Sequence, residues 1–293
     1  MPEGWNDTII VLIPNVAKPE QVKDLRPISL CNVLYKLVSK VLANRLKVIL
    51  PEVISLSQSA FVPGRLICDN ILVANELTHY MRNKRKGKEG YAAIKLDMSK
   101  AYDRVEWAFL RDMMVKLGFR ENWIDLIMKC VSSVSYRVRV NGNLSDRFTL
   151  ERGLRQGDPL SPYLFLICAE GFSALLNQAE EEGRIEGVKV CQNAPSVSHL
   201  LFADDSLILF RANRDDALQL QRILDVYEEC SGQTIYRDKS AIMFSPNTSS
   251  TDKGVVMEAL NSEHTERNDE REISGTTSFC GTKQEKGLFL SEG

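Results

Sequence analysis

Apolar runs that end at turn-forming residues divide the chain into short extended segments. Such runs predict strands at 9–13, 91–96, 137–140, 197–201 and 206–210. Asn141-Gly142, directly after the third run, is a strong signal for a hairpin turn. The last two runs are separated by Phe202-Ala203-Asp204-Asp205, which we expect to be a tight turn between two strands.

Apolar residues at helical spacing predict helices between these runs. The clearest helix covers 32–50, and Pro51 is expected to end it. Its apolar stripe, which we expect to face the core, consists of Leu34, Leu37, Val38, Val41, Leu42, Leu46 and Ile49. Further helices are predicted after Asp69, over 99–117, after Pro162 and around 220–227. This mixture of helices and strands predicts an α+β fold.

The periodic pattern is lost near Pro246. Residues 261–287 are polar, contain few branched apolar residues and show no preferred face. Such a segment buries too little apolar surface to offset the entropy of ordering it. We therefore expect residues 246–293 to form a disordered tail unrelated to the rest of the chain.

Composition narrows the class of protein. The 293 residues are 44% hydrophobic and 26% charged, as in ordinary globular proteins. The sequence contains no apolar stretch long enough for a membrane helix and no visible secretory signal. The seven cysteines are scattered, without CxxC pairs, which indicates reduced thiols and argues against a zinc site. We expect a protein that is not secreted.

The net charge of −2 conceals an uneven distribution. Residues 251–293 carry five of the 37 basic and nine of the 39 acidic side chains, which leaves 32 and 30 in residues 1–250. The main part of the chain therefore has a net charge of +2. Binding of nucleic acid would depend on local patches, such as the basic loop 82–88, because the overall field is weak. A solvated loop is the simpler interpretation of 82–88.

Acidic residues interrupt apolar strand sequence at two places. Asp97 follows the run 91–96, and Asp204 and Asp205 lie in the turn between two very apolar runs. Two like charges about 4 Å apart cost on the order of 4 kcal/mol at an effective dielectric constant of about 20, so a cation is expected to offset them. Carboxylates from separate strands hold the two Mg²⁺ ions that support phosphoryl transfer. Each motif alone is also typical of a turn or of a helix cap.

Several motifs occur in the order and at the spacing of one known family. They are Arg26-Pro-Ile-Ser-Leu30, Ser57-Gln-Ser-Ala-Phe-Val-Pro-Gly-Arg65, Leu96-Asp97-Met-Ser-Lys-Ala-Tyr102-Asp103, Gly153-Leu-Arg-Gln156-Gly157-Asp-Pro-Leu-Ser-Pro162, Phe202-Ala-Asp-Asp205 and Ser231-Gly-Gln233 with Lys239-Ser240. This series resembles the reverse transcriptases of non-LTR (LINE-type) retrotransposons, most closely those of plants. The resemblance covers about residues 9–244.

The resemblance implies a right-hand polymerase with an antiparallel palm sheet packed by helices. It implies fingers elements in 1–90 and the palm in 91–245. The implied activity is RNA-directed DNA synthesis, in which dNTPs extend a DNA primer on an RNA template. The implied cofactor is Mg²⁺, with Mn²⁺ as a substitute, and no membrane is involved. The implied compartment is the nucleus or the cytoplasm.

The resemblance also assigns roles to residues. Asp97 and Asp204 would be the principal metal ligands, with Asp205 assisting, and Lys239 would protonate the leaving pyrophosphate. Arg26, Tyr102, Gln156 and Gly157 would contact the nucleotide, with the ring of Tyr102 excluding a 2′-hydroxyl, and Arg65 would contact the template. From the residues alone, other interpretations are equally open. Arg26 could be a surface arginine and Tyr102 a core aromatic ring, while Gln156-Gly157 could be a helix-entry turn and Lys239 a solvated lysine.

The sequence departs from the family pattern at several points. Asn15 and Tyr236 replace a lysine and an asparagine that the family usually has, and no thumb-like block follows Phe244. We expect a truncated domain, without an endonuclease domain before it. A decayed, inactive retroelement fragment with residual nucleic-acid binding is the alternative hypothesis. An intron-type maturase or an RNA-dependent RNA polymerase is a further one, against which Tyr102 and the Phe-Ala-Asp-Asp turn argue.

Overall fold

The computed structural model describes residues 4–237 and 240–261, and these fall into two compact units. Within these ranges, the first unit comprises residues 4–54, 100–170 and 230–233, and the second comprises 55–99, 171–229, 234–237 and 240–261. Each unit is therefore assembled from separate segments of the chain. The compact units do not coincide with the boundaries at residues 90 and 245 that we expected for fingers and palm. Those boundaries remain a prediction.

The first unit contains a mixed sheet with the strand order β2-β1-β4-β5. Strand β1 (Asp7–Pro14) pairs antiparallel with β2 (Leu25–Cys31) and parallel with β4 (Ser135–Val140). The hairpin from β4 to β5 (Asn143–Leu144) turns at Asn141-Gly142, where φ is 50° and 85°. Positive φ at both positions is typical of a type I′ turn, so the predicted hairpin is confirmed.

Helices of the first unit are α1 (Val33–Val53), α3 (Ala101–Arg104), α4 (Trp107–Lys116) and α5 (Glu121–Ser132), and a short 3-10 helix, η1, spans Val22–Asp24. The first part of α6 (Ser161–Glu181) also belongs to this unit. The side chain of Asn32 caps α1 by accepting a hydrogen bond from the backbone nitrogen of Leu34 at 2.9 Å.

Two expectations for α1 were wrong. The helix continues past Pro51 to Val53, so the proline does not end it. Leu34, Leu37, Val41 and Ile49 are exposed, whereas the buried residues are Tyr35, Ser39, Leu42, Ala43, Leu46 and Leu50. Apolar residues surround most of this helix, so their spacing alone does not identify the buried face. The buried face includes the hydroxyl groups of Tyr35 and Ser39, which require polar partners inside the unit.

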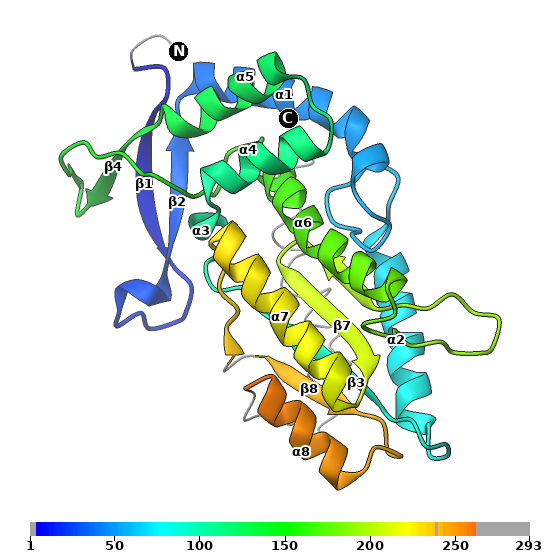
Figure 1. The fold of residues 1–293 in the computed structure, drawn as a ribbon. Coiled ribbons are helices and arrows are strands. Elements are labelled where there is room, and N and C mark those ends of the chain that lie inside the picture. The colour runs from blue at the N-terminus through cyan, green and yellow to red at the C-terminus, as the bar shows by residue number, and fades with distance from the viewer. Residues whose placement is uncertain (1–3, 238–239, 262–293) are drawn as a thin grey trace. The chain divides into compact units, whose positions relative to one another are not determined.

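The second unit contains an antiparallel sheet with the strand order β6-β7-β3-β8. Figure 1 labels β7, β3 and β8 of this sheet. The strands are β3 (Tyr91–Leu96), β6 (His199–Phe202), β7 (Asp205–Arg211) and β8 (Ala241–Phe244). The helices are α2 (Ile67–Asn83), α7 (Arg214–Ser231), α8 (Ser250–Ala259) and the second part of α6. The expectation of an α+β fold with an antiparallel sheet packed by helices is confirmed.

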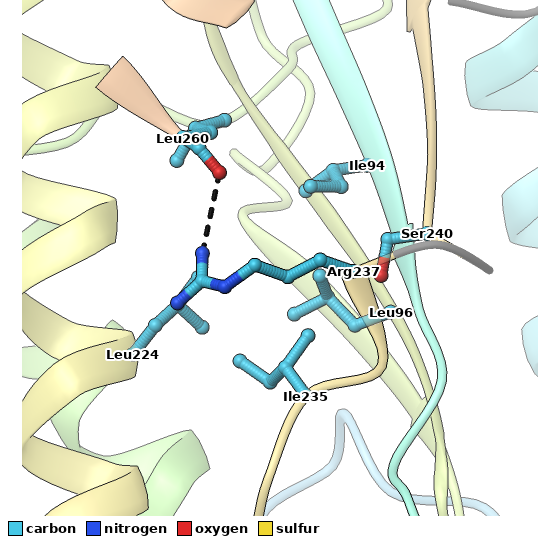
Figure 2. Close-up of a pocket in the computed structure, with 7 residues that line it drawn as sticks. All are labelled: Ile94, Leu96, Leu224, Ile235, Arg237, Ser240 and Leu260. Carbon is cyan, nitrogen blue, oxygen red and sulfur yellow. Dashed lines mark hydrogen bonds between the residues drawn. The ribbon is translucent and has the colours of Figure 1, made fainter. Parts of the chain in front are cut away.

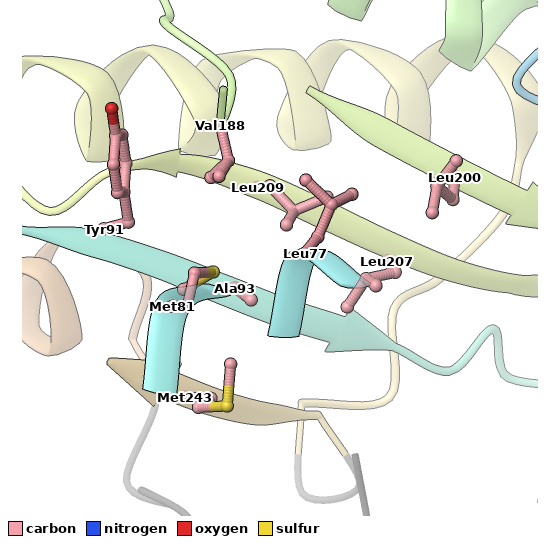
Figure 3. Packing of buried hydrophobic residues seen from close by; sticks show 9 residues of the cluster. All are labelled: Leu77, Met81, Tyr91, Ala93, Val188, Leu200, Leu207, Leu209 and Met243. Atoms are coloured by element: carbon pink, nitrogen blue, oxygen red, sulfur yellow. The ribbon is translucent and has the colours of Figure 1, made fainter. Parts of the chain in front are cut away.

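The core of the second unit follows the alternation of its strands. Figure 3 shows Leu77 and Met81 of α2 against one face of the sheet, where they meet Ala93 of β3 and Leu207 and Leu209 of β7. Successive residues of a strand point to opposite faces, so the residues between these face the other side. On that side Ile94 and Leu96 line a pocket together with Leu224 of α7 (Figure 2).

Part of the expected disordered tail is folded. Residues 250–259 form α8, in which Val256 is fully buried, and the side chain of Ser249 caps its first turn. After the helix, Arg237 donates a hydrogen bond to the carbonyl oxygen of Leu260 at 3.2 Å across the pocket in Figure 2. These long-range contacts supply the burial that the local sequence lacks. Residues 262–293 lie outside the described residues.

None of the described helices is both long enough and apolar enough to cross a membrane. The six cysteines in the described ranges are free thiols.

Candidate active site

The acidic residues singled out from the sequence lie at one end of the second unit's sheet. Strands β3 and β7 are antiparallel, and Leu96 lies opposite Ser206. Beyond this pair, at the same end of the sheet, the next residues of the two segments are Asp97 and Asp205. Opposed residues of an antiparallel pair have Cα atoms about 5 Å apart. Asp205 pairs with Phe202 across the turn, and Asp204 lies within that turn. Asp97 and Asp204, which lie 107 positions apart in the sequence, therefore lie at the same end of the sheet.

Backbone contacts fix the segment that carries Asp97. Its carbonyl oxygen accepts a hydrogen bond from the backbone nitrogen of Tyr236 at 2.8 Å, and Ser99 donates to the carbonyl oxygen of Thr234 at the same distance. Met98 forms an isolated bridge with Ile235 between these two bonds. The segment 234–236 thus holds the chain straight where it leaves β3. Asp97, Asp204 and Asp205 are all half-buried.

The turn between β6 and β7 has an uncommon backbone conformation. Ala203 has φ of 53°, in the left-handed region that residues other than glycine seldom adopt. A two-residue hairpin with positive φ at its first position normally has glycine there. Ala203 is 5% exposed and packs with Ala60 and Phe202 in a small apolar cluster. The turn that carries Asp204 is therefore held by contacts beyond its own sequence.

The nucleotide-binding candidates all belong to the first unit. Arg26 is an exposed residue of β2, opposite Ile13. The backbone nitrogen of Ser29, three residues further along β2, donates to the carbonyl oxygen of Gln156 at 2.9 Å. The backbone nitrogen of Leu154 donates to the carbonyl oxygen of Tyr102 at 2.7 Å. The loop that carries Gln156 is thus attached to both β2 and α3.

Two glycines allow these close approaches. A Cβ on Gly153 would lie 2.8 Å from the carbonyl oxygen of Asp103, and one on Gly157 would lie 3.2 Å from that of Ser29. Both glycines also have positive φ, at 93° and 100°. The Gly-rich motif is therefore required by packing of the loop, whatever else it contacts.

The Tyr102 ring is half-buried and stacks on the ring of Phe165, with centroids 5.0 Å apart and planes 14° apart. Such a contact fixes the orientation of the ring. The side-chain amide of Gln156 donates to the carboxylate of Asp103 at 3.4 Å. Burial raises the pKa of the Asp103 carboxyl group, and the hydrogen bond from Gln156 opposes that shift.

The other two predicted residues have different outcomes. Arg65 is half-buried, and its guanidinium donates to the carbonyl oxygens of Ser55 and Gln58, the second at 2.7 Å. It therefore braces its own loop, a role that the sequence did not indicate. Lys239 lies outside the described residues.

The loop 153–161 contains a buried ion pair that sequence reasoning missed. Arg155 and Asp158 lie 2.9 Å apart and their side chains are 3% and 4% exposed. Tyr35 and Ser39 of α1 donate to Asp158, and Arg155 donates to Asn6, Thr8 and the carbonyl oxygen of Cys130. This network explains why α1 buries Tyr35 and Ser39. Two opposite charges at spacing i, i+3 in this loop were the available signal.

The donor chemistry of the acidic cluster fits a hard divalent cation. Carboxylate oxygens are the ligands that Mg²⁺ and Mn²⁺ prefer. Within the described residues, no group of three or more His, Cys, Asp or Glu side chains forms a ready metal-binding cage.

Comparison with known proteins agrees with this geometry. Residues 16–285 match the reverse transcriptase (RNA-dependent DNA polymerase) family. The match extends into the segment that we expected to be unrelated. The chain is 32% identical to a 149 kDa protein of transposon TX1 from Xenopus laevis, over 82% of this chain and 18% of that protein. It is 28% identical to the Pol polyprotein of retrotransposable element R2 from Popillia japonica, over 71% of this chain and 28% of that protein.

Solved structures show the same fold. Apo telomerase from Candida tropicalis, truncated from its C-terminal domain, superposes with a TM-score of 0.56 at 17% identity, over 84% of this chain and 51% of that one. The chain spans only a minor part of the transposon proteins that it matches. The polymerase-like sheet with its acidic end, the ordered motifs and the family match lead to one conclusion: the chain belongs to the reverse transcriptase family, as a domain of the non-LTR retrotransposon kind.

Proposed function

We propose that this chain performs RNA-directed DNA synthesis, in which dNTPs extend a DNA primer on an RNA template with the aid of Mg²⁺. The observation that carries the proposal is the pairing register that brings Asp97 next to the Asp204-Asp205 turn. Carboxylates at the ends of adjacent strands suit two-metal phosphoryl transfer. The nucleus or the cytoplasm remains the expected compartment.

Each group of residues has a separate task in this proposal. Asp97, Asp204 and Asp205 hold the metal ions, which when bound stabilise the charge on the attacking and leaving oxygens. Tyr102 excludes the 2′-hydroxyl of a ribonucleotide. Arg26 neutralises the triphosphate, and the loop at Gln156 and Gly157 supports the base pair. We retain Lys239 as the general acid and Arg65 as a template contact.

Replacing Asp204 with asparagine tests the metal-binding role. We expect Asp204→Asn, and likewise Asp97→Asn, to reduce primer extension on an RNA template by about 100-fold or more, because a ligand of the metal loses its charge. Asp215→Asn is the control, since Asp215 is an exposed residue of α7 in the same unit. Extension is measured as dNTP incorporation at saturating Mg²⁺.

The outcomes of this assay separate the alternatives. Full activity in Asp204→Asn would contradict the proposal. Absence of incorporation by the parent chain, under conditions in which it binds the primer–template duplex, would favour the decayed retroelement product that retains only nucleic-acid binding.

Replacing Tyr102 tests the sugar discrimination. We expect Tyr102→Ala to raise the incorporation of NTPs relative to dNTPs by about 10- to 100-fold, because the space that excludes the 2′-hydroxyl opens. Tyr102→Phe is the control, since it keeps the ring that stacks on Phe165. The ratio of kcat/KM for dNTP and NTP is the measurement. An unchanged ratio in Tyr102→Ala would remove Tyr102 from the nucleotide site.

A further inference from the structure

A glutamine remote from the acidic motifs in sequence contacts the turn that carries Asp204. Gln58 is 1% exposed and belongs to the second unit. Its side-chain oxygen accepts hydrogen bonds from the backbone nitrogens of Ala60 at 2.9 Å and Ala203 at 3.0 Å. Both neighbours are donors, so the oxygen and not the nitrogen of the amide must face them. The Nε2 atom has no hydrogen-bond partner among the described residues.

The segment that carries Gln58 is firmly attached to the sheet. The backbone nitrogen of Leu201 donates to the carbonyl oxygen of Ser57 at 2.8 Å, and that of Ser59 donates to the carbonyl oxygen of Leu201 at 3.2 Å. Gln58 thus forms a parallel bridge beside β6, the edge strand of the sheet. The side-chain amide of Asn70 donates to the carbonyl oxygens of Ser57 and Leu201, at 2.8 and 3.0 Å. The Gln58 amide is therefore rigidly placed.

The hydrogen bond to Ala203 acts at a residue with an uncommon backbone conformation. Ala203 has positive φ and directly precedes Asp204. An alanine in this conformation relaxes toward negative φ unless its peptide is held. Rotation of that peptide would change the direction of the Asp204 and Asp205 side chains. A buried acceptor from another segment prevents this rotation.

We propose that Gln58 is a positioning residue for the acidic turn: its buried amide oxygen holds Ala203 in the left-handed conformation and thereby sets the direction of the Asp204 and Asp205 carboxylates. The consequence for catalysis rests on the proposed function, whereas the restraint on the turn does not. Catalytic geometry tolerates little displacement, since a shift of about 1 Å reduces rates by about 100-fold.

Gln58→Met tests the proposal, because methionine has a similar length but no comparable acceptor. We expect hydrogen exchange at the Ala203 amide to accelerate by about 10-fold, the loss of one buried hydrogen bond. We also expect kcat to fall by about 100-fold and half-saturation to require about 10-fold more Mg²⁺, with KM for dNTP unchanged. Gln58→Glu keeps an acceptor at the same reach and should retain the protection of the Ala203 amide.

Thr78→Val is the matched control. Thr78 is a buried residue of the same unit, and its hydroxyl donates to the carbonyl oxygen of Asn75 within α2 and not to the turn. We expect the control to keep the parental Mg²⁺ requirement. An equal rise in the Mg²⁺ requirement of Thr78→Val would identify the effect as general loosening and overturn the proposal.

The two proposals fail in different ways. Unchanged exchange at Ala203 in Gln58→Met overturns the positioning role, even when Asp204→Asn abolishes activity. If exchange at Ala203 accelerates in Gln58→Met but the parent chain does not incorporate dNTPs, the positioning role is supported and the result counts against the proposed function. If Gln58→Met does not fold, Gln58→Asn replaces it, because its shorter amide no longer reaches both backbone nitrogens and the same exchange measurement decides.

Discussion

Arg155→Met is expected to lower the free energy of unfolding by about 3–5 kcal/mol, because it leaves the carboxylate of Asp158 buried without its charge partner. The pair lies 2.9 Å apart and almost fully buried. The guanidinium also lies over the ring of Tyr35, 3.9 Å from its centroid. Its loss would also remove the hydrogen bonds that it donates to Asn6 and to the carbonyl oxygen of Cys130. Urea unfolding followed by circular dichroism measures the change.

Arg111→Met is the control for this substitution. Arg111 forms ion pairs with Glu121 and Asp125 on the surface of the same unit, where its side chain is 39% exposed. Exposed pairs contribute at most about 1 kcal/mol, so a much smaller loss is expected. A double variant that replaces both members of the buried pair, Arg155→Met with Asp158→Leu, should lose less than the sum of the single changes. Equal losses in Arg155→Met and Arg111→Met would refute a stabilising role for the buried pair.

Acidification is expected to destabilise the second unit through His199. Burial lowers the pKa of this imidazole to about 4, from an ordinary value of 6.5. Its ring nitrogens lie 2.7 Å from the hydroxyl of Ser173 and 3.0 Å from that of Ser198. The unfolded chain binds a proton at higher pH than the folded chain does. The contribution of neutral His199 is therefore complete above pH 6.5 and is lost as the pH falls from 6.5 toward 4.

The size of this effect follows from the pKa difference. The free energy of unfolding should decrease by about 2 kcal/mol between pH 7.5 and pH 5, and by about 3 kcal/mol at pH 4. His199→Gln, which does not titrate, should remove this part of the pH dependence in urea unfolding. His79→Gln is the control, because His79 is exposed on α2. If His199→Gln keeps the parental pH profile, other groups cause the acid sensitivity.

Local chemistry made several features predictable. The hairpin at Asn141-Gly142 follows from residues that adopt positive φ, and the start of α1 follows from the capping side chain of Asn32. The position of Asp97 after one apolar strand and of Asp204 in the turn between two later apolar strands could be predicted from the same kind of local pattern. The pairing of β3 with β7, and the register that places both motifs at one end of the sheet, came from the tertiary structure.

Non-local partners decided the features that were missed. Apolar residues on several sides of α1 left its buried face undetermined, and Asp158, more than 100 positions away, selected the face with Tyr35 and Ser39. The fold of residues 250–259 likewise depends on burial of Val256 and on Arg237. Gln58 looked like an ordinary residue of a conventional motif, although its oxygen contacts Ala203, 145 positions further along.

The sequence by itself determined the family, the strand and turn positions of the acidic residues, and the hairpin signals, because these depend on residue types and short spacings. Only the tertiary structure decided which face of α1 is buried, that Arg155 and Asp158 of the 153–161 loop form a buried ion pair, and what restrains the turn before Asp204. These depend on partners distant in sequence, and a buried polar atom selects its partner by geometry that periodicity does not encode.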